Sequence, residues 1–337
     1  MKHKILPIFL PFIGCKKICI YCNQNNITGI NESNLIKCVE EQLKKHLDLN
    51  IRWNEVAFYG GTFTALPLEL QVQLLRIINN KLPKLSIRIS TKPNCINKII
   101  LDTLQSYNVK TIELGIQSLS NDVLKNNNRD YTEYEVIQSI NELKRYPFIL
   151  GAQLMCGLFS EKKEDFIYTV DKLACQPIKY IRIYPLIVLK NTQLEEFYNK
   201  RLYKPLEFND AIAYTAYSFI KFTKNNKIVI RMGLHITDSL KKSVVSGPLS
   251  EGFGDIVKIY ILFMYLQRGN KISIGDYDKS LIYGYNKFLY NNFKPLIVID
   301  NKKSKINWLT ICQVLYHENN EWIFEKQKNN FAEKFLY

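Results

Sequence analysis

Short apolar runs alternate with longer amphipathic stretches through the first half of the chain. In the longer stretches, such as NLIKCVEEQLKKHL at 34–47 and LELQVQLLRIINNKL at 68–82, apolar residues recur every three or four positions. That spacing predicts helices that cover a sheet, and the short runs predict its buried strands. The predicted strands are residues 4–10, 55–59, 85–90, 111–114, 148–155 and 180–184.

A strand and its following helix together repeat about every 30 residues, which is the length of a βα unit. Six such units predict an α/β fold in which a parallel sheet curls into an incomplete (β/α)6 barrel of the TIM type. Barrels of this kind carry their functional groups in the loops at the carboxyl ends of the strands. We therefore expect a site in the loop that follows the first strand, at residues 11–24.

The regular alternation stops after Tyr184. A helix is predicted at 208–223, and residues 231–258, which are rich in glycine and serine, are expected to form an ordered loop over a site. The expected division is a core domain at 1–206 and a smaller α/β C-terminal extension at 207–337, with a helical link and cap loop to about 265 and a small module at about 270–337.

The small module reads as strand, helix, turn, helix and strand, in KISIG, DKSLIYG, YNK, KFLYNNF and PLIVID. This order is similar to that of KH-type RNA-binding modules, in which the turn between the helices clamps a nucleic-acid backbone. The turn here, Gly284-Tyr285-Asn286-Lys287, lacks the second glycine of a KH turn. A cap that only packs on the barrel has the same order of elements, so both interpretations remain open.

The formal net charge is +15, from 46 Lys and Arg against 31 Asp and Glu. Such an excess favours polyanions, with RNA as the first class to consider, although biased codon usage in a chain rich in Asn, Ile and Tyr supplies lysines equally well. The amino-terminal MKHKILPIFLPFIGC resembles a lipoprotein signal, but Pro7 and Pro11 interrupt its apolar run. No apolar stretch is long enough to span a bilayer. We expect a cytoplasmic protein with no membrane partner.

Three of the eight cysteines, Cys15, Cys19 and Cys22, fall within the stretch PFIGCKKICIYCNQ. Four thiolates would close a zinc site or fully ligate a [4Fe–4S] cluster, whereas three leave one metal position open for a ligand or for catalysis. A zinc site would need a fourth ligand nearby, and His3, Cys38 and His46 do not have the spacing of a zinc finger. The other cysteines are expected to be small buried apolar residues: Cys38, Cys95, Cys156, Cys175 and Cys312.

The stretch CKKICIYC matches the C-x3-C-x2-C signature of radical S-adenosylmethionine (radical SAM) enzymes, including the aromatic Tyr21 before the third cysteine. The resemblance implies that Cys15, Cys19 and Cys22 hold three irons of a [4Fe–4S] cluster and that S-adenosylmethionine chelates the fourth. In that family, one electron splits the sulfonium and yields a 5′-deoxyadenosyl radical, which abstracts a hydrogen atom from the substrate.

Further stretches at successive strand ends extend this resemblance: AFYGGTF, ISTKPN, ELGIQS, NNNRDY and GAQLMCGLF. In the family the Gly-Gly loop receives the amino group of the methionine moiety, and the resemblance implies that Arg129 pairs with its carboxylate. Glu113 and Gln117 are expected to reach the nucleoside and methionine. The implied cofactor-binding residues are Tyr21, Gly60, Gly61, Thr62, Ser90, Glu113, Gln117, Arg129 and Gln153.

Within the family, residues 1–206 resemble the radical domain of the catalytic subunit of Elongator, a tRNA-modifying enzyme, and its short bacterial relatives. No glycine loop for acetyl-coenzyme A, as in an acetyltransferase domain, is evident. The resemblance implies a radical enzyme that modifies RNA, with tRNA as partner and a ferredoxin or flavodoxin as electron donor. The alternatives are a radical enzyme that acts on a small molecule, such as a relative of porphyrinogen oxidases, and a non-catalytic RNA-binding Fe–S protein.

Overall fold

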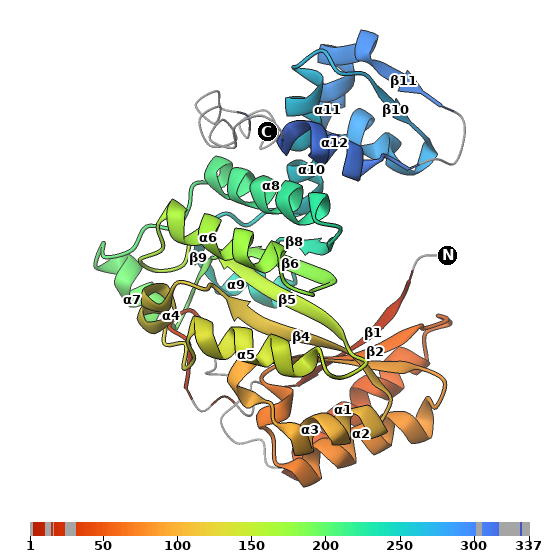
Figure 1. The fold of residues 1–337 in the computed structure, drawn as a ribbon, viewed down its shortest axis with the longest axis vertical. Helices are drawn as coiled ribbons and strands as arrows, with labels where there is room; N and C mark the ends of the chain where they lie inside the picture. Colours follow the sequence, from red (N-terminus) through yellow and green to blue (C-terminus); the bar gives the residue numbers. More distant parts are fainter. Residues whose placement is uncertain are drawn as a thin grey trace.

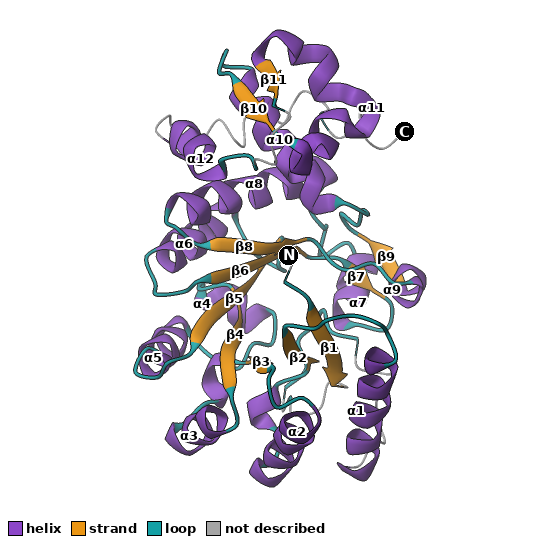
Figure 2. Ribbon diagram, turned by 90° about the vertical axis from the view of Figure 1, so that its right-hand side faces the viewer, coloured by secondary structure: helices purple, strands orange, loops and turns teal. Residues whose placement is uncertain are grey.

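The computed structural model describes residues 3–10, 15, 17–23, 32–300, 305–316 and 331. Its centre is a parallel sheet of seven strands in the order β1-β2-β3-β4-β5-β6-β8, curled so that one side stays open (Figures 1 and 2). The strands are β1 (Ile5–Leu10), β2 (Glu55–Gly60), β3 (Ser86–Thr91), β4 (Val109–Gln117), β5 (Ile149–Cys156), β6 (Tyr180–Pro185) and β8 (Ile228–Met232).

Helices cover the outer, convex face of the sheet, as Figure 2 shows. Alternate residues of each strand point toward them, so Leu6 and Ile8 of β1 are fully buried while Phe9 is 57% exposed on the inner face. The helices that follow β1 to β6 are α1 (Glu32–Leu47), α2 (Leu68–Lys81), α3 (Lys98–Ser106), α4 (Asn121–Asn126), α5 (Glu133–Leu143), α6 (Lys163–Ala174), α7 (Gln193–Asn199) and α8 (Phe208–Lys224).

The incomplete barrel and its first six strands are confirmed, and the structure corrects the prediction by adding a seventh strand. Strand β8 pairs in parallel with β6 after α8, so the sheet continues past residue 206. We missed β8 because it is an edge strand with Ile228 and Ile230 partly exposed, which leaves no pattern of buried residues to detect. The segment 231–258, expected to be a loop, contains the end of β8, α9 (Asp238–Ser243), β9 (Val244–Ser246) and the start of α10 (Phe253–Leu266).

The C-terminal extension contains the predicted order of strand, helix, turn, helix and strand. Strands β10 (Ile272–Ile274) and β11 (Ile297–Ile299) pair in parallel, and α11 (Lys279–Phe293) lies between them. Helix α11 is interrupted at 284–287, where three consecutive residues have positive φ angles. A further helix, α12 (Trp308–Tyr316), packs on α8, with the rings of Trp308 and Phe219 at 5.3 Å. The extension thus shares one hydrophobic core with the barrel.

Residues 188–189 form the short strand β7 (Val188–Leu189), which pairs antiparallel with β9. This pair connects the segment after β6 to the segment after β8 (Figure 2). Among the described residues, no helix combines the length and the apolar character that a membrane span requires.

Candidate functional site

A cavity of about 170 Å³ lies at the carboxyl ends of strands β1 to β5. All three clustered cysteines line it, together with every predicted cofactor-binding residue except Glu113. The lining residues are Cys15, Lys17, Cys19, Tyr21, Cys22, Gly60, Gly61, Thr62, Ser90, Thr91, Lys92, Gly115, Gln117, Arg129 and Gln153. Residues from six segments that lie far apart in the chain therefore surround one space.

The cysteine segment is held at this cavity by contacts to two other loops and by a hydrogen bond within the segment. The Cys15 sulfur lies 3.2 Å from the hydroxyl of Thr62, which follows β2. The Cys19 sulfur accepts a hydrogen bond of 3.1 Å from Nη1 of Arg129, a residue between α4 and α5. The amide of Cys22 donates to the carbonyl of Cys19 at 3.0 Å, which closes a tight turn between these two cysteines.

Arg129 is fixed at the cavity wall by several acceptors. Its Nη2 donates to the carbonyl of Gly115 at 2.6 Å, and its Nε donates to the hydroxyl of Tyr131 at 2.7 Å. Loss of water contact alone would lower the pKa of Arg129, but Tyr131, Tyr21 and Cys19 raise it well above its ordinary value. The guanidinium thus stays charged beside the Cys19 sulfur.

The hydroxyl of Tyr21 is buried near the guanidinium of Arg129. Burial raises the pKa of Tyr21 well above its ordinary value, although the positive charge of Arg129 acts in the opposite direction. Tyr21 therefore stays neutral at physiological pH.

Gly60 ends β2 opposite Leu10, the last residue of β1. Its φ of +104° lies in a region that other residues rarely adopt, and a Cβ on Gly60 would overlap the Leu10 carbonyl oxygen. The close approach of the first two strands is thus sufficient to require glycine at this position.

Gln117 also has an unusual backbone, with a φ of 65° at a bulge where β4 shifts its register against β5. A left-handed conformation in a residue other than glycine costs on the order of 1–3 kcal/mol and occurs often at functional sites. The bulge re-aims Gln117, which lines the cavity.

Glu113 is the predicted site residue that does not line the cavity. It is buried, and its carboxylate accepts hydrogen bonds from Arg88 (2.5 Å) and from Nε of Arg182 (2.7 Å). Burial alone would raise the pKa of Glu113, but the charges of Arg182 and Arg88 hold it below its ordinary value. Glu113 also accepts from Nε2 of Gln153 at 3.0 Å, so it contacts the cavity through a lining residue.

This ion pair belongs to a network that crosses the inner face of the sheet. Arg88 on β3 also contacts Glu55 on β2 at 2.9 Å, and Arg182 on β6 donates to the hydroxyl of Tyr59 at 2.7 Å. Two carboxylates and two guanidinium groups thereby balance in charge beneath the cavity. The network joins β2 to β6 across the interior of the half-barrel.

Three lining residues were not among those expected from the sequence: Thr91, Lys92 and Gly115. The Lys92 ammonium pairs with Asp130 at 3.0 Å, and the Asn94 side chain donates to the Asp130 carbonyl at 2.8 Å. These two contacts hold Asp130, the residue that follows Arg129 in the chain. The stretch ISTKPN, which carries the resemblance at the end of β3, contains the lysine and was a usable signal.

The residues of the cavity suit an anionic iron–sulfur cluster. Three thiols supply the soft ligands that such clusters use, and Lys17, Lys92 and Arg129 line the same space with no described carboxylate among them. Across the residues that the structure describes, no three Cys, His, Asp or Glu side chains gather closely enough to hold one metal ion. Thiols that bind separate irons of a cluster need a wider spacing than the ligands of a single ion.

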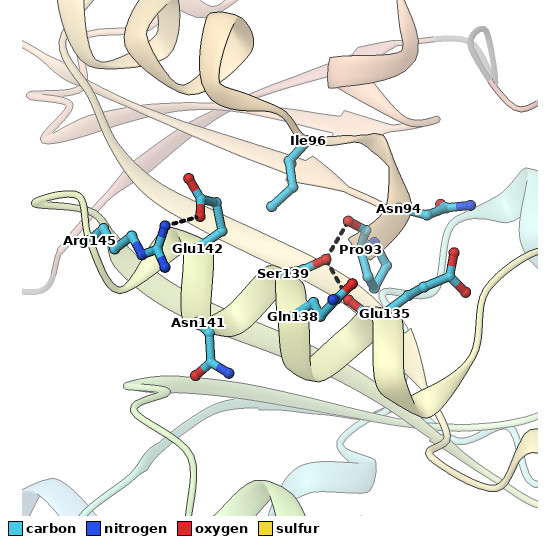
Figure 3. Close-up of a pocket in the computed structure, with 9 residues that line it drawn as sticks. All are labelled: Pro93, Asn94, Ile96, Glu135, Gln138, Ser139, Asn141, Glu142 and Arg145. Atoms are coloured by element: carbon cyan, nitrogen blue, oxygen red, sulfur yellow. Dashed lines mark hydrogen bonds and ion pairs between the residues drawn. The ribbon is translucent and has the colours of Figure 1, made fainter.

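A second hollow, of about 460 Å³, lies on the outside of the barrel between α5 and the loop after β3 (Figure 3). Ser139 of α5 donates to the carbonyl of Pro93 at 2.6 Å, and Arg145 pairs with Glu142 at 2.9 Å. No cysteine or histidine lines it. It offers no chemistry comparable to that of the thiol-lined cavity.

Family models match two parts of the chain. The model of the Radical SAM superfamily matches residues 9–173, and the model of the Radical SAM C-terminal domain matches residues 178–262. The first match includes the three clustered cysteines and the strand ends β2 to β5.

Curated relatives are similar over part of their length. An uncharacterized protein of Methanocaldococcus jannaschii is 28% identical over 226 residues, which cover 63% of this chain and 70% of that protein. Human Elongator complex protein 3 is 26% identical over 200 residues, which cover 52% of this chain and 36% of that protein. The chain thus spans about a third of the length of the Elongator proteins that it matches.

Solved structures share the fold. The archaeal Elp3 of Methanocaldococcus infernus, with an N-terminal deletion, aligns with a TM-score of 0.62 at 18% identity, covering 85% of this chain and 67% of that one. Coproporphyrinogen III oxidase from Escherichia coli aligns with a TM-score of 0.54 at 14% identity, covering 92% of this chain and 89% of that one.

Proposed function

Because this chain is an enzyme that belongs to the Radical SAM superfamily, we propose that Cys15, Cys19 and Cys22 bind a [4Fe–4S] cluster and that the protein cleaves S-adenosylmethionine reductively to modify RNA. When bound, the cluster and S-adenosylmethionine supply a 5′-deoxyadenosyl radical. The observation that carries the proposal is one cavity lined by three thiols and three cationic side chains.

The other lining residues would hold S-adenosylmethionine. Gly60, Gly61 and Thr62 present backbone and a hydroxyl at the end of β2, next to Cys15. Arg129 offers a charged N–H group for the methionine carboxylate. The remaining proposed contacts are Tyr21, Ser90, Gln117 and Gln153.

Glu113 is proposed to act through Gln153 and not by contact. Its two arginine partners use both carboxylate oxygens, and Gln153 donates to both Glu113 and Ser90. The Glu113 carboxylate therefore fixes the orientation of the Gln153 side chain, which lines the cavity proposed to hold S-adenosylmethionine.

The substrate is proposed to be tRNA, with a small iron–sulfur or flavin protein as electron donor. Support comes from the resemblance of the first 206 residues to the tRNA-modifying Elongator subunit and from the net charge of +15. In the extension, Tyr285, Asn286 and Lys287 have φ angles of 49°, 58° and 56°, and Asn286 and Lys287 are exposed. Such a turn between two helices suits a contact with a nucleic-acid backbone.

The metal content tests the first part of this proposal. Anaerobically reconstituted protein should hold about four irons per chain, and Cys19→Ala should lose them. Cys175→Ala is the matched control, because Cys175, which was expected to be buried, is exposed and does not line the cavity. Stoichiometric zinc without iron under these conditions would refute the cluster.

Mass spectrometry of tRNA nucleosides, from cells with and without the protein, tests the substrate. A nucleoside that disappears with the gene supports tRNA modification, whereas an unchanged set in cells that express the active enzyme points to a small molecule.

Binding of tRNA tests the exposed turn. Lys287→Gln should weaken binding and reduce its salt dependence by about one counterion. Lys98→Gln, on exposed α3, is the matched loss of charge and should have little effect. Equal affinities would exclude the turn as an RNA contact. Point variants are preferred to truncation because α12 and Phe331 belong to the shared core.

A further inference from the structure

Helices α4 and α8 end in the same local motif. The C-cap residue is Asn127 in α4 and Asn225 in α8, and the side chain of each donates to the carbonyl four residues earlier, at 2.7 and 2.8 Å. Each is followed by an asparagine with a φ of 57°, Asn128 or Asn226. Asn127 and Asn225 are therefore equivalent as helix caps. Any further contact that only one of them makes must have a reason other than capping.

Asn127 makes such further contacts. Its Nδ2 also donates to the carbonyl of Phe159 at 2.9 Å, and its Oδ1 accepts from the Phe159 amide at 3.3 Å. The residue is fully buried, whereas Asn225 is partly exposed. Asn127 thus joins the end of α4 to the loop after β5 by a two-way contact of side chain with main chain.

The main chain of Asn127 reaches the cysteine segment. Its carbonyl accepts a long hydrogen bond of 3.4 Å from the amide of Ile20, which lies between Cys19 and Cys22. The carbonyl of Ile20 in turn accepts from the amide of Leu194 at 2.8 Å. The peptide groups on both sides of Ile20 are therefore held by distant parts of the chain.

The side chain of Ile20 completes this attachment. It is 3% exposed and belongs to a small apolar cluster with Leu158 and Leu194, separate from the main core. Leu158 lies in the loop that Asn127 holds. Three segments therefore hold Ile20. Asn127 contacts its amide, Leu194 contacts its carbonyl, and Leu158 and Leu194 belong to the apolar cluster around its side chain.

We propose that Asn127 is a positioning residue, which fixes the segment between Cys19 and Cys22 in its metal-binding arrangement before iron arrives. This inference rests on the proposed cluster at the three cysteines. A segment that is already ordered loses less conformational freedom when it takes up its ligand, so the cluster is held more tightly. Asn127 touches none of the reacting groups and acts through the main chain of Ile20 and the loop at Phe159.

Asn127→Ala tests this role, with Asn225→Ala as the matched loss of a helix cap. Both variants should lower the melting temperature of the metal-free protein. After anaerobic reconstitution, only Asn127→Ala should lose iron to a chelator faster than the wild type, by about fivefold, and show an altered electron paramagnetic resonance spectrum of the reduced cluster. Iron loss and spectra that match the wild type in both variants would overturn the proposal.

Hydrogen exchange of the metal-free wild type covers the case in which Asn127→Ala does not fold. The Ile20 amide should exchange slowly, because Asn127 holds it without metal, and exchange at the rate of an unstructured peptide would also overturn the proposal. The two inferences fail in different ways. If the wild type itself takes up no iron, the proposed function fails, whereas a wild type with a full cluster and an indifferent Asn127→Ala removes only the role of Asn127.

Discussion

The guanidinium of Arg129 donates a hydrogen bond to the sulfur of Cys19 across 3.1 Å, although the two residues are 110 positions apart. A positive N–H donor on a ligand sulfur stabilises the more negative, reduced state of an iron–sulfur cluster. We therefore propose two roles for Arg129: it pairs with the methionine carboxylate, and it donates a hydrogen bond to a proposed cluster ligand.

Arg129→Ala is expected to weaken binding of S-adenosylmethionine by about 1.5–3 kcal/mol, the usual value for a hydrogen bond to a charged group. It should also lower the midpoint potential of the cluster, because the N–H donor to Cys19 is lost. Calorimetry and a potentiometric titration measure the two effects. Arg145→Ala removes an exposed arginine on the outer hollow and should change neither quantity. An unaltered affinity in Arg129→Ala would remove this residue from the cofactor site.

Glu113→Gln is expected to destabilise the fold by about 3–5 kcal/mol, because it leaves Arg88 and Arg182 buried without their shared carboxylate. Chemical denaturation of the metal-free protein measures this loss. Glu142→Gln removes one partner of the exposed pair with Arg145 and should cost about 0.5 kcal/mol or less. A small effect of Glu113→Gln would mean that water reaches the inner face of the sheet.

Glu161 predicts a dependence of stability on pH. Its carboxylate accepts the amides of Gly157 and Leu158, but burial raises the pKa of Glu161 to about 8. From the ordinary value of 4.5 up to about 8, the unfolded chain releases this proton while the folded chain keeps it. The free energy of unfolding should therefore fall as the pH rises through this window and level off above it.

Denaturation at several pH values checks this expectation, with Glu161→Gln as the comparison. In Glu161→Gln, the free energy of unfolding should not show the decrease with pH that Glu161 causes. The variant should therefore gain stability relative to the wild type as the pH approaches 8. Parallel pH profiles for the two proteins would show that the carboxyl ionises normally in the folded state.

Gly60→Ala is expected to lower the free energy of unfolding by more than Gly269→Ala. Both glycines have positive φ, so both variants lose about 1–2 kcal/mol to backbone strain. Only a Cβ at Gly60 meets another atom, the Leu10 carbonyl oxygen, whereas nothing lies within 4 Å at Gly269. Denaturant titration of the two variants measures the difference in their free energies of unfolding. That difference reports the cost of a Cβ at the close approach of β1 and β2. Equal losses would place the cost in the backbone angle alone.

Local patterns predicted much of the fold and part of the site. Apolar runs identified six strands because each of those strands has a face buried under helices, and the strand ends located Cys15 and Gln117 around one cavity. Strand β8 was missed because its exposed edge carries no such pattern.

Contacts between distant segments explain the remaining differences. Glu113 was expected near a strand end, but it lies in the middle of β4, where Arg88 on β3 and Arg182 on β6 pair with its carboxylate away from the cavity. Asn127 and Asn225 look alike in sequence, and only the folded chain shows that one of them contacts Phe159. Such roles depend on residues far apart in the chain, which periodicity and spacing do not report.

The attachment of the cysteine segment has a consequence for biosynthesis. The chain is synthesised in order, so Cys15, Cys19 and Cys22 precede two anchors of their segment: Asn23 donates to the carbonyl of Lys190, 167 positions later, and the carbonyl of Ile20 accepts from the amide of Leu194. The thiols therefore leave the ribosome long before their protein partners exist. During that interval they are exposed to oxidants and to stray metal ions. We therefore expect that the thiols must be kept reduced until residues 190–194 have emerged, and that the proposed cluster is inserted only after that point.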